Sequence, residues 1–336
     1  MATLSQPPSS AQRATNVAFL WTCQAFAWLT LALVAFIVLR IAWAAAPAIG
    51  QQGLGFMTGR VWDPNQHAYG ILPEVWGTLY SSVLALVIGG LFGVAAAIFL
   101  SEGFLAAGVF ALLKLFKVEH APVWRDLPDR IEDLLRNLIE LLAAIPSVVY
   151  GLWGLFVVIP LLRPSANWLH ANLGWVPFFG TTLSGPGMLP AVLVLAIMIL
   201  PTVTALSRDA LVSVPSKLRM AAYGMGATRW ETILAVILPT ASRGVFGAVV
   251  LAFGRALGET MALAMLVGNS NRISVSLFSP ANTLAALLAN NFPEAGRNEV
   301  GVLMYAALVL LAITLAVNIM GSLILQRASG EMEAMR

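Results

Sequence analysis

Two residues of opposite charge, Arg255 and Glu259, lie inside the otherwise apolar stretch FGRALGETMAL. Placing either charge at the centre of a membrane-spanning helix costs about 2.5–3.5 kcal/mol. On a continuous helix, a spacing of four residues places both side chains on one face, where they can pair. A guanidinium is also the side chain best shaped to bind an oxyanion through two N–H groups.

Two interpretations of this pair stay open. In the first, Arg255 and Glu259 form a structural ion pair that fixes helix packing. In the second, Arg255 lies on the route of an anion, and Glu259 keeps the arginine oriented and prevents tight retention of the anion, since an anion path must release what it admits. Either interpretation requires both side chains to face the protein interior or an aqueous path.

Hydroxyl-bearing residues that follow prolines form a second set of candidates. Ser147 follows Pro146, and Thr202 and Thr204 follow Pro201. A proline in a helix frees a backbone carbonyl of the preceding turn, which neighbouring groups or water must satisfy. Such positions either line a cavity or form simple kinks. The candidate substrate path therefore consists of Arg255, Glu259, Ser147, Thr202 and Thr204.

The elements that must position these residues are transmembrane helices. Of the 336 residues 59% are hydrophobic and 10% are charged, whereas roughly a quarter of the residues in a soluble protein are charged. About 20 apolar residues suffice for a helix to cross a bilayer. The sequence predicts an all-α polytopic membrane protein with six transmembrane helices, in the windows 18–39, 77–100, 141–162, 189–206, 244–267 and 301–325.

The lysines and arginines predict how these spans are oriented, because they are enriched in cytoplasmic loops. The second and fourth loops hold Lys114, Lys117, Arg125, Arg130, Arg136, Arg208, Lys217, Arg219, Arg229 and Arg243, and the alternate loops hold Arg60, Arg163, Arg272 and Arg297. Both termini are therefore expected to be cytoplasmic. The expected division is a cytoplasmic tail over 1–17, a first span over 18–44, an external loop over 45–76, a core of five spans over 77–325 with a cytoplasmic loop over 208–240, and a cytoplasmic tail over 326–336.

Catalytic motifs are missing from this sequence. The three histidines, His67, His120 and His170, fall in predicted loops, and the single cysteine is Cys23. The sequence contains no G-x-S-x-G, no H-E-x-x-H and no phosphate-binding glycine loop ending in Lys-Ser or Lys-Thr. We therefore expect a chain without enzymatic activity, metal or cofactor of its own. The net charge of +3 reflects the excess of Lys and Arg in the predicted cytoplasmic loops and does not indicate a nucleic-acid partner.

The fourth loop contains a predicted helix, a break and a second helix, in the stretch SVPSKLRMAAYGMGATRWETILAVILPT. Good helix formers run from Ser216 to Met225, and Gly226 ends that helix. Thr228 and Glu231 have the spacing of a capping box. Ala221, Ala222, Gly224 and Gly226 would form a small-residue surface that another protein can approach closely. The alternative is an ordinary helical hairpin.

The order of these residues resembles the EAA loop of binding-protein-dependent ABC importers. Met220-Ala221-Ala222, three residues, Gly226, nine residues and Val236-Ile237-Leu238-Pro239 match the pattern E-A-A, three residues, G, nine residues, I-x-L-P. Met220 and Val236 depart from it. In that family the loop forms the coupling helix that contacts the ATPase, so the resemblance implies a coupling set of Ser216, Met220, Ala221, Ala222, Gly224, Gly226 and Thr228.

Four further stretches resemble permeases of phosphate-specific importers, of the PstC type: ELLAAIPSVVYGLWGLF, GRALGETMALAM, FLSE and GLGFMTGRVWDP. The resemblance implies the type I ABC importer permease fold in a bacterial plasma (inner) membrane. It also implies a second permease of the PstA type, a cytoplasmic ATPase dimer that binds ATP and Mg, and an external phosphate-binding protein. Open alternatives are a permease for sulfate or molybdate, or an ATPase-independent secondary transporter or channel. The loop over 102–136 is longer than is usual for the family.

Overall fold

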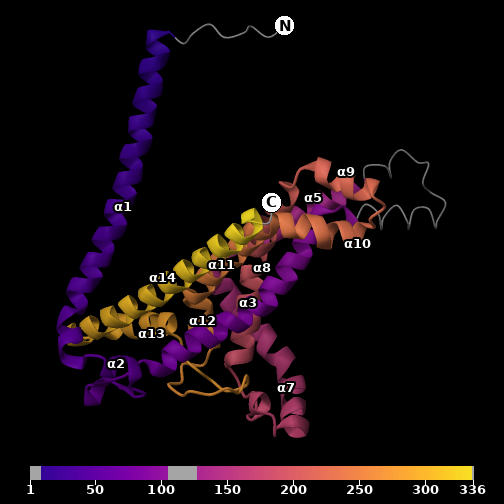
Figure 1. Cartoon of the computed structure of the whole chain (residues 1–336). Coiled ribbons are helices and arrows are strands. Elements are labelled where there is room, and N and C mark those ends of the chain that lie inside the picture. The colour runs from indigo at the N-terminus through magenta and orange to yellow at the C-terminus, as the bar shows by residue number, and fades with distance from the viewer. Residues whose placement is uncertain (1–8, 105–126, 335–336) are drawn as a thin grey trace.

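The computed structural model describes residues 9–104 and 127–334, and it shows a bundle of long helices with one helix splayed away (Figure 1). The elements are α1 (Ser10–Gln52), α2 (Gly55–Thr58), β1 (Trp62–Asp63), η1 (Pro64–Gln66), β2 (Ala68–Tyr69), α3 (Leu72–Ser101), α5 (Leu127–Ala144), α6 (Ser147–Trp153), η3 (Gly154–Val158), α7 (Ile159–Leu173), η4 (Pro177–Phe179), α8 (Met188–Val212), α9 (Ser216–Gly224), α10 (Arg229–Thr232), η5 (Ile233–Ile237), α11 (Leu238–Leu257), α12 (Met261–Leu266), α13 (Leu284–Asn291), η6 (Phe292–Glu294) and α14 (Arg297–Ala334).

Six helical stretches of the described chain are long and apolar enough to cross a membrane: Ser10–Gln52, Leu72–Ser101, Ser147–Leu173, Met188–Val212, Arg229–Leu257 and Asn298–Arg327. The prediction of an all-α polytopic membrane protein with six spans is confirmed. α5, α9 and α10 lie together at one side of the bundle, here called the α9 side, and α7 and α13 lie toward the other (Figure 1).

The third span begins six residues later than the sequence window predicted. α5 ends at Ala144, and α6 begins at Ser147 after an extended Pro146 with φ −60° and ψ 141°. Pro146 lacks an N–H donor, and its ring would clash with the carbonyl of the preceding turn, so α5 cannot continue through it. Residues 141–144 therefore belong to α5, a helix that the sequence analysis treated as loop.

The fifth span ends earlier than predicted. α11 ends at Leu257 with Gly258 as its C-cap, and the short helix α12 begins at Met261. Glycine favours a helix end because it has the lowest helix propensity of the residues other than proline. The Glu259 carboxylate accepts a hydrogen bond from the Ala262 N–H at 3.4 Å and so caps α12. The window 244–267 is therefore two helices.

Two short π-helical segments, η3 and η5, each end two residues before a proline, Pro160 and Pro239. A proline ring clashes with the carbonyl four residues earlier in an α-helix. A wider π-helical turn at that point lets the helix continue without the lost bond. The five residues Ile233–Ile237, directly before Leu238 and Pro239, form such a π-helical turn.

α3 and α8 form the tightly packed centre of the bundle. A Cβ atom at Gly89 would lie 2.6 Å from the Ala196 carbonyl oxygen, and one at Gly93 would lie 2.8 Å from the Val203 side chain. Glycines at these two positions therefore allow the helix backbones to approach closely. α1 packs against α14 through its C-terminal part, where Ala45 and Ala48 are buried.

The segment between α1 and α3 is more ordered than the expected loop over 45–76. α1 continues to Gln52, and β1 pairs antiparallel with β2 with Trp62 opposite Tyr69. Asp63 caps the connecting turn by accepting bonds from the N–H groups of Asn65 and Gln66. At the other end α1 begins at Ser10, inside the expected N-terminal tail.

Candidate functional site

The side chain of Arg255 connects α11 to α8. Its Nη1 donates a hydrogen bond to the Thr202 hydroxyl over 3.1 Å, and the arginine is exposed to the surface of the bundle. Thr202 follows Pro201 within α8. The structure thus brings together two members of the candidate path that are 53 residues apart in the sequence.

The intrahelical pairing of Arg255 with Glu259 was a wrong expectation. α11 ends between the two residues, so a spacing of four no longer places them on one helical face. No ion pair within 4 Å joins them among those of the described residues. Thr202 holds Arg255, and Glu259 is half-buried as the cap of α12.

The hydroxyl of Thr204 contributes to helix packing. Thr204 is buried, and its Oγ1 donates a hydrogen bond to the Gly93 carbonyl over 3.2 Å, which joins α8 to α3. This bond supports the interpretation of Thr204 as a kink-associated packing residue. The same residue borders the pocket described below.

Ser147 occupies the first position of α6 and is partly exposed. Tyr150, three residues later in α6, lies within electrostatic range of Arg255 and donates a hydrogen bond to the Leu142 carbonyl over 2.9 Å. α6 packs closely on α12, because a Cβ atom at Gly151 would lie 2.7 Å from the Met265 sulfur. Residues of α6, α8 and α11 therefore converge near Arg255.

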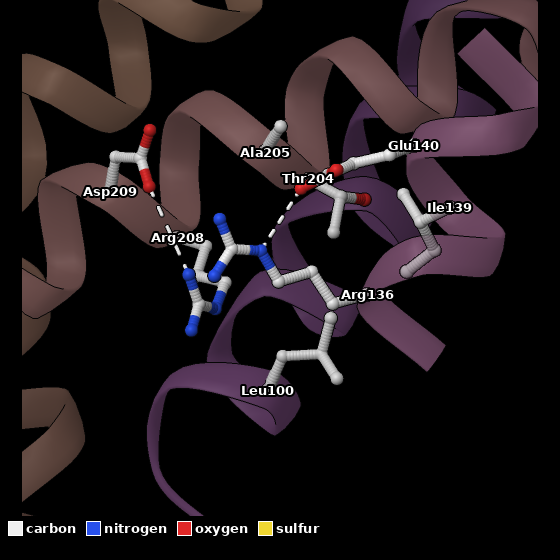
Figure 2. A pocket seen from close by; sticks show the side chains of 8 residues that line it. All are labelled: Leu100, Arg136, Ile139, Glu140, Thr204, Ala205, Arg208 and Asp209. Carbon is white, nitrogen blue, oxygen red and sulfur yellow. Dashed lines mark hydrogen bonds and ion pairs between the residues drawn. The ribbon is translucent and has the colours of Figure 1, made fainter. Parts of the chain in front are cut away.

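A small pocket of about 60 Å³ opens on the α9 side between α3, α5 and α8 (Figure 2). It is lined by Leu100, Arg136, Ile139, Glu140, Thr204, Ala205, Arg208 and Asp209.

Each arginine of this pocket has a carboxylate neighbour. Arg136 Nε lies 2.9 Å from Glu140 Oε1, and Arg208 Nη1 lies 4.0 Å from Asp209 Oδ1. The hydrogen bond to Glu140 raises the pKa of the Arg136 guanidinium above its ordinary value. Because the two positive and two negative charges balance, the pocket has no net charge to attract an anion. Nothing in the sequence indicated this pocket, because Arg136 was expected in a loop and lies in α5.

The loop after α8 has the predicted helix, break and second helix. α9 ends at Gly224, Gly226 has a left-handed φ of +86°, and Thr228 and Glu231 form a capping box that begins α10. Met220 has an exposed fraction of 71%. The sequence pattern alone was enough to predict this geometry.

One member of the expected small-residue surface is inaccessible. Ala222 is 2% exposed, because it faces the bundle and its carbonyl accepts bonds from the N–H groups of Met225 and Ala227. Ala221, Gly224 and Gly226 are exposed. Ala222 therefore cannot belong to a contact surface for another protein, and this part of the expectation was wrong.

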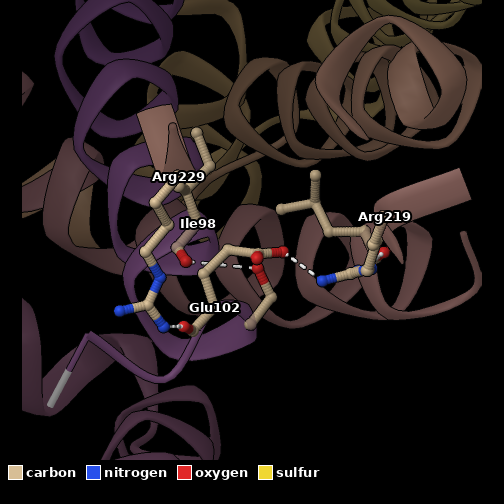
Figure 3. Close-up of polar contacts among 6 residues, drawn as sticks. Ile98, Glu102, Arg219 and Arg229 are labelled. Carbon is tan, nitrogen blue, oxygen red and sulfur yellow. Dashed lines mark hydrogen bonds and ion pairs between the residues drawn. The ribbon is translucent and has the colours of Figure 1, made fainter. Parts of the chain in front are cut away.

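An arginine–glutamate contact that the sequence analysis missed joins α9 to the bundle (Figure 3). Arg219 Nη1 lies 2.5 Å from Glu102 Oε1, and Arg219 Nη2 donates to the Leu211 carbonyl over 2.7 Å. Glu102 is the last residue of the FLSE stretch, and 117 positions separate it from Arg219. A glutamate directly after an apolar span was the one available signal.

The described chain combines six apolar spans with a helix–glycine–helix loop between the fourth and the fifth span. The chain matches the family model described as "Binding-protein-dependent transport system inner membrane component" over residues 123–330. This match covers more than half of the chain. The chain belongs to this family of importer permeases, among its PstC-type members.

Two curated relatives illustrate the similarity. A phosphate transport system permease protein PstC of Xylella fastidiosa is 36% identical over 310 residues, which cover 91% of this chain and 88% of the relative. A protein of the same name from Haemophilus influenzae is 38% identical over 314 residues, covering 92% of each chain.

Solved structures support the same fold at low sequence identity. A chain in the crystal structure of a bacterial alginate ABC transporter, in complex with an alginate-bound periplasmic protein, aligns with TM-score 0.53 and 16% identity, covering 92% of this chain and 97% of that chain. A chain of the inward-facing MetNI methionine ABC transporter aligns with TM-score 0.52 and 17% identity, covering 77% of this chain and 95% of that chain. The fold is that of a type I ABC importer permease.

Proposed function

We propose that this chain is the permease through which an ATP-driven, binding-protein-dependent importer moves inorganic phosphate. The observation that carries the proposal is the exposed helix α9, which ends at the left-handed Gly226 and is followed by a second capped helix. A loop of this shape on a family member provides a docking element for a partner that supplies energy. The names of the relatives support phosphate as the substrate.

The proposed assembly contains a second permease of the PstA type, a cytoplasmic ATPase dimer that binds ATP and Mg, and an external phosphate-binding protein. The α9 side faces the cytoplasm, together with both termini, and lipid of a bacterial inner membrane surrounds the apolar helices. The excess of Lys and Arg in the second and fourth loops supports this orientation. This chain itself contributes no cofactor site, and its loops meet proteins, not nucleic acid.

The proposed transport step is alternating access. The ATPase dimer closes on ATP and displaces α9, and the spans move as rigid bodies between an outward-open and an inward-open arrangement. This chain then hydrolyses nothing; it converts the movement of its partner into access for the substrate. The exposed position of Met220 on α9 supports an apolar contact with the ATPase in place of the family's usual glutamate.

The proposed anion contact is the guanidinium of Arg255. A guanidinium has five N–H donors, and the bond to Thr202 uses one of them. The remaining donors suit a tetrahedral oxyanion, and the hydroxyls of Ser147 and Thr202 lie on neighbouring helices of the same region. Thr204 contributes by holding α8 against α3. Glu259, four residues along the chain, weakens anion retention by its own negative charge.

Purification from native membranes followed by reconstitution tests this function. We expect the binding protein and the ATPase to co-purify, and we expect proteoliposomes with these components to accumulate radiolabelled phosphate only when ATP is supplied. Sulfate and molybdate should neither enter nor compete. Uptake of sulfate or molybdate would identify a different oxyanion permease. Uptake by the chain alone, without ATP, would identify a secondary transporter or channel.

A further inference from the structure

Three elements meet at the α9 side through the side chain of Arg219 (Figure 3). Its two terminal nitrogens contact Glu102 Oε1 at 2.5 Å and the Leu211 carbonyl oxygen at 2.7 Å. Glu102 is the C-cap of α3, and Leu211 lies in the last turn of α8. One side chain on α9 therefore holds the ends of two membrane spans at the same time.

The contact is largely shielded from water. The Glu102 side chain is 5% exposed, and the Arg219 side chain is 20% exposed. A carboxylate with so little water around it needs an ionised, hydrogen-bonded partner. The planar fork of a guanidinium can serve two acceptors in fixed directions, which a lysine ammonium does with less precision. Arginine is thus the residue that can reach both acceptors at once.

A second contact attaches the segment beyond Gly226 to the same point. Arg229, the first residue of α10, donates a hydrogen bond to the Glu102 carbonyl oxygen. Its guanidinium also lies 4.6 Å from the centre of the Phe104 ring, a cation–π contact. The left-handed Gly103, with φ +58°, turns the chain so that Phe104 reaches this position. Both helices of the loop are therefore bound to the end of α3.

α3 and α8 are suited to move together. Their backbones are in close contact at Gly89 and Gly93, and the Thr204 hydroxyl bonds across the same interface. A displacement of the ends of these two helices is therefore transmitted to the interior of the bundle, because closely packed backbones leave little room for side chains to absorb the movement. By contrast, the ion pair between Arg136 and Glu140 lies within α5 alone and joins no two elements.

We propose that Arg219 is a positioning residue that fixes α9 to the ends of α3 and α8, so that a displacement of α9 moves this helix pair as a unit. Glu102 is the acceptor that makes the attachment specific. The proposal rests on the proposed function, in which a cytoplasmic ATPase displaces α9. It gives the FLSE stretch a role in energy coupling.

The decisive measurement is the number of phosphate ions imported per ATP hydrolysed, in proteoliposomes that contain the complete complex. For Arg219→Met we expect ATP hydrolysis to continue and this ratio to fall about tenfold, which is within the range usual for coupling between sites. Arg219→Lys should restore part of the ratio. Glu102→Gln keeps an oxygen for Arg219 but loses its charge, so its ratio should fall by a smaller factor. Arg136→Met, the matched control, should keep the wild-type ratio.

The outcomes separate this proposal from the function on which it rests. If the wild-type complex imports no phosphate with ATP, the proposed function fails, and the coupling role of Arg219 fails with it. If the wild type imports phosphate and Arg219→Met has the same ratio, only the positioning role is overturned. If Arg219→Met does not assemble, the ratios of Glu102→Gln and Arg219→Lys test the positioning role instead. A wild-type ratio in both variants would overturn that role.

Discussion

The guanidinium of Arg255 is held by a neutral hydroxyl, and this changes what the residue can do. An arginine paired with a buried carboxylate has its charge compensated, so it attracts an anion only weakly. Bonded to Thr202, Arg255 keeps its full positive charge and most of its donors. The geometry contains no ion pair between Arg255 and Glu259 among those of the described residues, so the anion contact proposed for Arg255 can be tested separately from Glu259.

The two residues should respond differently to substitution. We expect Arg255→Met to assemble normally and to lower phosphate uptake at least tenfold, because a bidentate charged contact contributes about 1.5–3 kcal/mol. Glu259→Gln keeps a side-chain oxygen that can cap α12 but removes the charge proposed to weaken anion retention, so it should assemble normally, retain phosphate longer than the wild type and lose less uptake than Arg255→Met. Uptake is measured in proteoliposomes and normalised to assembled complex. Near-normal phosphate uptake by Arg255→Met would contradict the anion-path interpretation.

Among the elements, the loop around α9 depends on one backbone conformation. Gly224 and Gly226 both have open space where a Cβ atom would be added, but only Gly226 has a positive φ, of +86°. An L-residue in the left-handed conformation costs about 1–2 kcal/mol. Substituting alanine at either glycine adds the same methyl group, but only at position 226 must the alanine adopt a left-handed backbone conformation. The two substitutions therefore form a matched pair.

Gly226→Ala should uncouple ATP hydrolysis from transport, whereas Gly224→Ala should leave coupling intact. Alanine at 224 improves helix propensity by about 1 kcal/mol, so it should not disturb α9. The measurement is ATP-dependent phosphate uptake together with co-purification of the ATPase. If both variants lost coupling to the same extent, the left-handed backbone of Gly226 would not be what coupling requires. The requirement would then be that the partner approaches both glycines closely.

A second matched pair tests the packing of α3. A Cβ atom at Gly77 would lie 1.9 Å from the Asn282 carbonyl oxygen, whereas one at Gly90 meets nothing within 4 Å. We expect Gly77→Ala to destabilise the purified protein by about 1–3 kcal/mol, as overpacking usually does. Gly90→Ala should be neutral or stabilising. Thermal unfolding in detergent provides the comparison, and equal midpoints would show that the approach of Asn282 to α3 is not tight.

At the scale of the whole molecule, the proposed orientation predicts which loops are accessible from each side. A reporter fused after Ser216 should be cytoplasmic, and reporters after His67 or Asn172 should be external. Asn282 is 4% exposed, so Arg272, which is exposed in the same connection, is the better fusion point for the third external loop. Ala121 lies outside the described residues, and the sequence predicts that it is cytoplasmic.

These fusions are read by an enzyme that is active on only one side of the membrane. The expected pattern follows from the retention of Lys and Arg on the cytoplasmic side. A cytoplasmic signal after His67 or an external signal after Ser216 would contradict the proposed orientation. In the inverted orientation α9 would lie outside the cell, where no ATPase could reach it.

The sequence by itself determined the class, the six spans and the shape of the α9 loop. A bilayer requires each crossing segment to be apolar along its own length, so a span can be recognised without knowing its neighbours. The break at Gly226 and the cap at Thr228 are also local, because their hydrogen bonds connect residues within one turn. Both features could be predicted for that reason.

Only the tertiary structure decided which polar residues meet. A spacing of four implies a shared face only while the helix continues, and α11 ends between Arg255 and Glu259. The contact of Arg219 with Glu102 spans 117 residues, and no local pattern encodes such a distance. Ala222 is inaccessible because of how α9 lies on the bundle. Side-chain partners across the fold follow from helix packing, and packing depends on every span at once.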